Sequence, residues 1–214
     1  ALLRHRATTL VIFSLASQTS WKGKCSVVHN TLVQVAPLEI LFRYLETHQE
    51  DTDLVFYTVK RSYASNLLAT QGKTETCIKA TIISANESAA QLCTTFKTVG
   101  ENSVDPFVIT YKTTGSDTME GEPVLDRMVV QYVNEKEKCL IVQHVGKETL
   151  DASMKSCDMV RASIDATGEE CNKEFSRMCG SSTKIISTTD GCTDVPTPRC
   201  SETSQPPSSA SEQV

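Results

Sequence analysis

The nine cysteines carry the most evident chemistry of this sequence, and they all lie between Cys25 and Cys200. Thiols at this density form disulfides or coordinate zinc. A zinc site would show cysteines two residues apart or clustered histidines, and the sequence has neither. The four histidines are scattered: His5, His29, His48 and His144. The pattern predicts disulfides and no metal, with at least one thiol left over because the number is odd.

The sequence also lacks the nucleophile motifs of common hydrolases. A catalytic cysteine needs a lowered pKa and a positioned base, whereas an oxidising environment favours disulfides. Serine and aspartate are abundant, but Gly-x-Ser-x-Gly does not occur. We therefore expect no enzymatic activity and no cofactor.

The N-terminus has the pattern of a secretory signal peptide. Arg4 and Arg6 precede a short apolar run, Thr8–Ala16, which ends in small residues suited to cleavage. A membrane anchor needs roughly 20 apolar residues, about twice the length of this run. We expect residues 1–16 to be a signal peptide and the rest to be secreted, extracellular and free of the membrane.

The charged residues argue against a nucleic-acid partner. The formal net charge is −5, and acidic and basic residues are interspersed without a basic block. Nucleic-acid binding depends on a basic surface that neutralises phosphates. Export would also expose a sequon, Asn86-Glu87-Ser88, so we expect Asn86 to be glycosylated.

Two segments have the apolar spacing of amphipathic helices. The first opens at Pro37, ends near Gln49 and has four apolar residues on one face, as is typical of core packing: Leu38, Leu41, Phe42 and Leu45. The second follows a capping box, Thr167-Gly168-Glu169-Glu170, and ends near Gly180. It carries Cys171 on its apolar face.

Between these helices the apolar spacing changes to the period of β-strands. Turn-forming residues separate the predicted strands, which are Leu54–Tyr63, Cys77–Ser84, Ala90–Val99, Pro106–Thr113, Val124–Val133, Cys139–Val145 and Ser153–Ala162. One more short strand is expected at Thr183–Thr188, after the second helix. About seven short strands at this spacing predict a sandwich or an up-and-down barrel.

The composition changes after Cys192 to proline, serine, threonine and glutamine. Such a segment cannot form a packed core. A chain of 214 residues is long enough for one substantial domain. We therefore expect one folded domain over residues 17–192 and a disordered tail over residues 193–214.

Several short motifs follow one another in a distinctive order. They are Tyr57-x-Val59-x-x-x-Tyr63, Val129-Val130-Gln131-Tyr132, Lys138-Cys139, Glu170-Cys171 and Asp190-Gly191-Cys192. Together with the order of helices and strands, this set resembles the lipocalins of tick saliva, the histamine-binding-protein family. The resemblance covers about residues 37–192. It implies an all-β, lipocalin-like antiparallel up-and-down barrel with an N-terminal helix and a C-terminal helix stapled by disulfides.

The resemblance also implies two disulfides, Cys77 to Cys192 and Cys139 to Cys171. The partners of five other cysteines stay open: Cys25, Cys93, Cys157, Cys179 and Cys200. A third bridge in some relatives would correspond to Cys25 with Cys179.

By resemblance, the protein is a secreted carrier that holds a small host mediator in its barrel and serves immune evasion. A biogenic amine, such as histamine or serotonin, needs buried carboxylates and aromatic faces. The candidate ligand-binding residues are Tyr57, Tyr63, Phe107, Tyr111, Tyr132 and Asp158.

The sequence departs from the amine-binding pattern of that family. Leu140 stands where an aspartate follows the cysteine, and Val160 stands where an aromatic ring follows the second acid, here Asp158. Asn66 and Ala69 replace an expected acid and tryptophan. A lipid, such as a fatty acid, an eicosanoid or a sterol, is therefore the alternative ligand.

A function of a different class is also open, because a fold does not settle a function. The protein would then bind a host immune or haemostatic protein through its surface loops, and the cavity would be incidental.

Overall fold

The computed structural model describes residues 35–63, 75–124, 126–147, 154–164, 168–181, 186–187, 189 and 192–201. The expected signal peptide, Cys25, Asn66, Ala69 and residues 202–214 lie outside the described residues.

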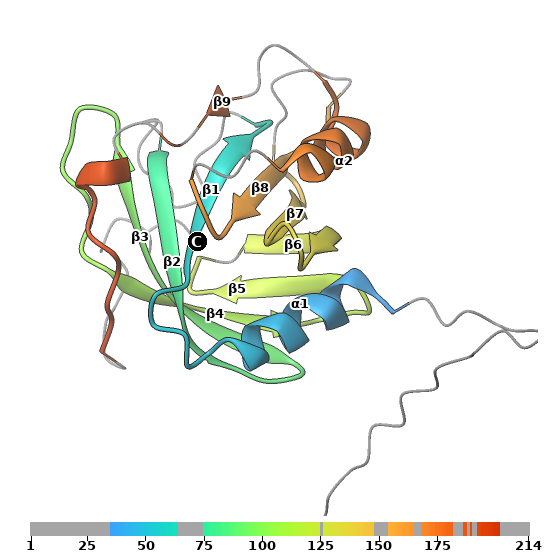
Figure 1. The fold of residues 1–214 in the computed structure, drawn as a ribbon, viewed down its shortest axis with the longest axis horizontal. Coiled ribbons are helices and arrows are strands. Elements are labelled where there is room, and N and C mark those ends of the chain that lie inside the picture. Colours follow the sequence, from blue (N-terminus) through green and yellow to red (C-terminus); the bar gives the residue numbers. More distant parts are fainter. Residues whose placement is uncertain are drawn as a thin grey trace, which may run out of the picture. The chain divides into compact units, whose positions relative to one another are not determined.

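Eight antiparallel strands close into an up-and-down barrel (Figure 1). Each strand pairs with its neighbour in the sequence, and β1 pairs with both β2 and β8, which closes the ring. The strands are β1 (Val55–Arg61), β2 (Glu75–Ala85), β3 (Ala89–Thr98), β4 (Phe107–Thr113), β5 (Thr118–Glu122), β6 (Asp126–Asn134), β7 (Cys139–His144) and β8 (Cys157–Arg161). The lipocalin-like fold class predicted above is confirmed by this closed order.

One strand of the barrel, β5, lies where no strand is predicted. Its sequence, Thr-Met-Glu-Gly-Glu, contains a glycine and two glutamates, which are depleted in strands. Gly121 pairs with Tyr111 on β4, and a Cβ atom at Gly121 would lie 2.7 Å from Cε1 of that tyrosine, so the ring occupies the space that a side chain would need. The strand predicted from Val124 begins instead at Asp126, because the turn before it completes the β5–β6 hairpin.

The remaining predicted strands are confirmed, with ends that differ by a few residues. After the second helix, β9 (Ile186–Ser187) pairs with the end of β1 and occupies part of the predicted strand Thr183–Thr188. Within the described residues, neither helix is long and apolar enough to span a membrane.

The helix α1 (Pro37–Thr47) covers one end of the barrel interior, where it contacts β2, β3 and β6 (Figure 1). It begins at Pro37, as predicted, and it ends two residues before Gln49. Its four predicted apolar residues are buried against Met119, Met128 and the inner faces of the strands. Burial of this face fixes the helix as a cover over the cavity described below.

The helix α2 (Glu169–Cys179) packs on the outside of β6 and β7. Cys171 and Phe175 are buried there among side chains on the outer face of the barrel. Gly180 ends the helix with a positive φ of 98°, and the end of the helix near this glycine agrees with the prediction.

The start of α2 differs from the predicted capping box. The N-cap residue is Gly168, which has no side chain with which to cap the helix, while Thr167 lies outside the described residues. Instead, the carboxylate of Glu137 accepts hydrogen bonds from the backbone N–H groups of Glu170 at 3.3 Å and Cys171 at 3.0 Å. A residue distant in sequence therefore supplies the cap, which local spacing cannot reveal.

Four disulfides link the described cysteines: Cys77–Cys192, Cys93–Cys200, Cys139–Cys171 and Cys157–Cys179. The first and third are the pairs that the resemblance implied. Cys179 bonds to Cys157, so the suggested bridge from Cys25 to Cys179 is wrong. The third and fourth disulfides fasten the two ends of α2 to β7 and β8.

The segment that follows α2 is held against the outside of the barrel. A short 3-10 helix, Cys192–Asp194, is followed by Val195, which is buried and accepts a hydrogen bond from Nζ of Lys79 through its carbonyl oxygen. Cys200 is bonded to β3. Residues 193–200 of the expected disordered tail are therefore packed, because the two disulfides at their ends fix them to β2 and β3.

Candidate functional site

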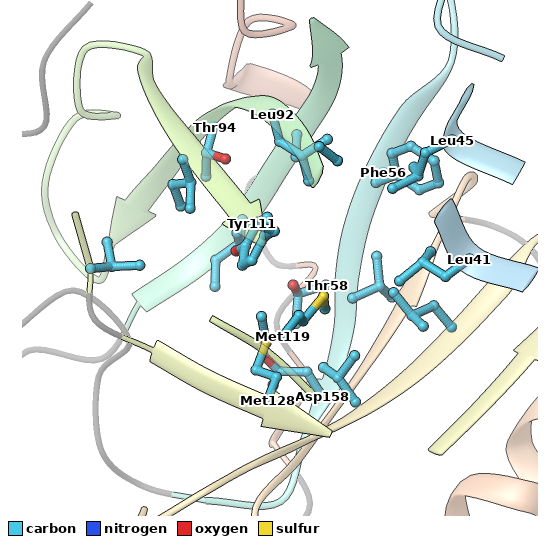
Figure 2. A pocket seen from close by; sticks show the side chains of 18 of the residues that line it. Leu41, Leu45, Phe56, Thr58, Leu92, Thr94, Tyr111, Met119, Met128 and Asp158 are labelled. Atoms are coloured by element: carbon cyan, nitrogen blue, oxygen red, sulfur yellow. The ribbon is translucent and has the colours of Figure 1, made fainter. Parts of the chain in front are cut away.

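The barrel encloses a cavity of about 120 Å³. Figure 2 shows side chains from α1 and from strands on different sides of the barrel converging on this space. Most of the lining is apolar. The polar residues that line it are Thr58, Thr94, Tyr111, His144 and Asp158.

Alternation along the strands explains which side chains reach the cavity. On β7, Leu140, Val142 and His144 share the inner face and all line it. On β1, Phe56 and Thr58 do the same. The helix α1 adds Leu41, Phe42 and Leu45 at its own end of the cavity, so that end is entirely hydrocarbon and ring surface.

A charged network fills the other end of the barrel. The ring of His144 donates a hydrogen bond from Nδ1 to Oδ2 of Asp126 at 2.7 Å and from Nε2 to Oδ2 of Asp158 at 3.1 Å. Oδ2 of Asp158 also accepts a hydrogen bond from the hydroxyl of Tyr63 at 3.0 Å. Its Oδ1 lies 3.3 Å from Nε of Arg61.

The network continues beyond Asp158 on both sides. Nη1 of Arg61 lies 3.5 Å from Oε2 of Glu75, and both side chains are fully buried. Nζ of Lys147 lies 3.9 Å from Oδ1 of Asp126. Every carboxylate of the network therefore faces at least one cationic group.

The protonation of His144 follows from its two neighbours. Burial alone would lower the pKa of this imidazole, but its hydrogen bonds to Asp126 and Asp158 raise the pKa to about 9. At neutral pH the ring is therefore an imidazolium that donates from both nitrogens. Burial would raise the pKa of Asp158, yet Arg61 and His144 hold that pKa below its ordinary value.

The charges of the network balance. Arg61, His144 and Lys147 carry three positive charges, and three carboxylates face them: Glu75, Asp126 and Asp158. Among the described residues Asp158 is the one carboxylate that lines the cavity, and it is already neutralised. The site can bind an apolar group, but it offers no unpaired counter-charge to a cation.

Two of the six predicted ligand-binding residues, Tyr111 and Asp158, line the cavity. Tyr57 and Tyr132 pack instead against the cluster beneath α2, on the outer face of the barrel. Tyr57 points outward because it alternates with the inward Phe56 and Thr58. For Tyr132, a bulge between Val130 and Tyr132 reverses the alternation.

The other two predicted residues, Tyr63 and Phe107, are fully buried without lining the cavity. Tyr63 donates a hydrogen bond to Asp158 and so helps to orient the carboxylate that lines the cavity. Phe107 packs edge-on against Phe96 with ring centroids 6.3 Å apart, in a separate part of the core.

Tyr63 is the one hydrogen-bond partner of Asp158 that was predicted as a site residue, whereas the charged residues of the network were not. For His144 a signal exists, because it continues the inward alternation of Leu140 and Val142 at the end of a strand. Arg61, Glu75 and Asp126 lie at strand ends, where sequence patterning does not separate a buried charge from an exposed one.

The predicted modification site lies in the β2–β3 turn. Asn86 is exposed, and its Oδ1 accepts hydrogen bonds from the backbone N–H groups of Ser88 and Ala89, both at 2.9 Å. Its Nδ2, the atom that would carry a glycan, is not engaged by these bonds. Glycosylation of Asn86 stays a prediction.

One group of potential metal ligands occurs among the described residues: Glu137, Cys139 and Cys171. Its two sulfur atoms form a disulfide, and its carboxylate caps α2. These atoms have structural partners already, so we assign no ion to them.

Comparison with known proteins gives matches among solved structures. The sequence matches no protein-family model and no curated protein. Among solved structures, the siderocalin Ex-FABP, which is described as functioning through dual ligand specificities, is similar with a TM-score of 0.41 and 8% sequence identity. The similarity covers 63% of this chain and 95% of that chain. The barrel is lipocalin-like. That assignment rests on the strand order and the closure between β1 and β8.

Proposed function

We propose that the protein is a carrier that sequesters a small, mainly apolar molecule in the barrel. The observation that carries this proposal is the pairing of Asp158, whose carboxylate is neutralised by Arg61 and His144. What remains of the cavity surface is largely apolar, as is usual for sites that take up hydrophobic ligands.

A biogenic amine is the less favoured ligand. An ammonium group in this cavity would need a carboxylate of its own, and Asp158 would have to give up a cationic partner. Displacing Arg61 or His144 would leave that buried cation with one carboxylate in place of two, and the ammonium group would add a fourth positive charge to three carboxylates. The three aromatic lining residues, Phe42, Phe56 and Tyr111, fit apolar rings and chains equally well.

The volume limits the size of the ligand. An apolar cavity of about 150 Å³ takes up benzene, which has six heavy atoms, so a cavity of about 120 Å³ suits a group of about that size. A short acyl chain or one aromatic ring would fit. An eicosanoid or a sterol is larger, and most of it would lie outside unless the barrel widened.

Secretion belongs to the same proposal. Four disulfides persist in oxidising compartments, and the apolar run in residues 1–16 would direct export. The two disulfides at the positions that the resemblance implied support kinship with tick salivary lipocalins, and a role in immune evasion would follow from that kinship. A host protein partner is the alternative.

The experiment measures the affinity for ethylbenzene by calorimetry in three forms of the mature protein. Ala80 lines the cavity, so Ala80→Phe places a ring inside it and should weaken binding at least tenfold. Ser84 is exposed on the same strand, and Ser84→Phe should leave binding unchanged. Equal affinity in all three forms, or no binding to the unaltered protein, would refute a carrier function of this cavity.

A further inference from the structure

Tyr44 on α1 has a buried hydroxyl group with no hydrogen-bond partner in the described part of the chain. Its residue exposure is 8%. The ring is held in place, because it stacks on His48 at 4.2 Å and meets Phe56 edge-on at 6.4 Å, measured between ring centroids. Buried hydroxyls almost always have a partner, so this one calls for an explanation.

Tyr44 borders a small second hollow of about 20 Å³ beside the β6–β7 turn. This hollow shares three wall residues with the main cavity, so the two spaces adjoin: Phe56, Leu140 and Val160. Its size is sufficient for one water molecule or one small polar group. A molecule in the main cavity could therefore extend a polar end toward Tyr44.

The chemistry around this hollow favours a group that accepts a hydrogen bond. Burial and the nearby carboxylates of Asp51 and Glu135 raise the pKa of Tyr44, so its hydroxyl keeps its proton and acts as a donor. Lys138, an exposed cation, also lines the hollow. Glu135 on the same rim lies 3.8 Å from Arg43.

We propose that Tyr44 is a specificity-determining residue that donates a hydrogen bond to the acceptor oxygen of an amphiphilic ligand. The apolar part of the ligand lies in the main cavity, and its polar end lies in the adjoining hollow. This inference rests on the carrier function proposed above. It narrows the ligand class from apolar molecules in general to those with a carbonyl, ether or carboxylate oxygen at one end.

The experiment compares three probes of similar shape on the full mature protein by calorimetry. Butylbenzene has no acceptor, 4-phenyl-2-butanone has a neutral one, and 3-phenylpropanoate has an anionic one. Tyr44→Phe should lower the affinity for the ketone about threefold to tenfold, which corresponds to the loss of one hydrogen bond. It should leave the affinity for butylbenzene unchanged. Because the hydroxyl has no partner among the described residues of the free protein, the melting temperature should be the same or higher.

Two further variants make the result specific. Thr47→Val removes a hydroxyl that bonds to Arg43 on the exposed side of the same helix, and it should change no affinity. Lys138→Gln should weaken the binding of 3-phenylpropanoate and leave the affinity for the ketone unchanged, because only an anionic oxygen in the hollow is attracted by the ammonium group of Lys138.

Ketone affinity that is equal in the Tyr44→Phe variant and the unaltered protein would overturn the inference, since the hydroxyl would then bind water only. An equal loss for ketone and butylbenzene would overturn it as well, because the effect would be one of packing. Failure of the unaltered protein to bind butylbenzene would instead overturn the carrier function itself.

Discussion

Two carboxylates, Asp126 and Asp158, flank the ring of His144 inside the barrel. Such a buried arrangement favours a charged ring, because a neutral imidazole can donate a hydrogen bond to only one of the two carboxylates. The network therefore ties the stability of the fold to the protonation of one residue. The same residue keeps Asp158 neutralised toward the cavity.

This coupling predicts how stability depends on pH. The folded pKa of His144, about 9, lies above its ordinary value of 6.5, so the folded state holds a proton that the unfolded state releases. The resulting stability is fully present below pH 6.5 and is lost as pH rises through 9. Over that interval the free energy of unfolding should fall by about 3 kcal/mol.

Urea unfolding at intervals from pH 6 to pH 9.5 measures this fall. Asp158 acts in the opposite direction at low pH: its pKa is lowered from 3.8, so its contribution is present above that value and is lost on further acidification. Stability that stays flat or rises between pH 6.5 and 9 would contradict a charged His144.

Among the structural elements, α2 depends most on residues far from it in sequence. Two disulfides hold its ends, and the carboxylate of Glu137 caps its first turn from the β6–β7 turn. The carboxylate also lies favourably at the positive end of the helix dipole.

Glu137→Ala should therefore lower the free energy of unfolding by about 1 kcal/mol, the usual worth of a helix cap. It should also speed hydrogen exchange at the amides of Glu170 and Cys171, which lose their acceptor. Glu135→Ala, in the same turn, removes an exposed carboxylate 3.8 Å from Arg43 and should cost less. A larger loss for Glu135→Ala would show that Glu137 does not cap the helix.

Sequence patterns predicted the elements wherever one face of a segment is apolar. The spacing of Leu38, Leu41, Phe42 and Leu45 predicts α1 correctly because all four side chains meet the barrel interior. The strand β5 could not be predicted in this way. Its glycine and glutamates disfavour a strand, and it forms because β4 and β6 offer it hydrogen-bond partners on both sides.

The candidate site was less predictable than the fold. Tyr111 and Asp158 were anticipated and line the cavity, whereas Tyr57 and Tyr132 point outward. The bulge before Tyr132 reverses which face of the strand the following side chains lie on, and no residue type at that position predicts a bulge. The neutralisation of Asp158 depends on residues from four other strands, β1, β2, β6 and β7, so only the closed barrel reveals it.

In the molecule as a whole, stability and binding are built from separate parts. Disulfides tie α2 and residues 192–200 to the outside of the barrel. Charges that cancel one another fill one end of the interior, and α1 covers the other end. The space between them is left apolar and empty of unpaired charge. This division is why we assign the cavity to an uncharged group.

The most direct measurement compares ethylbenzene with benzylamine on the unaltered mature protein at pH 7. The two molecules have nearly the same shape, but ethylbenzene ends in a methyl group where benzylamine carries an ammonium group. Burying the ammonium without a free carboxylate costs several kcal/mol, so benzylamine, and histamine with it, should bind at least about 100-fold more weakly. Benzylamine or histamine that binds as tightly as ethylbenzene would show that Asp158 is available to a cation, and an apolar ligand would no longer be the conclusion.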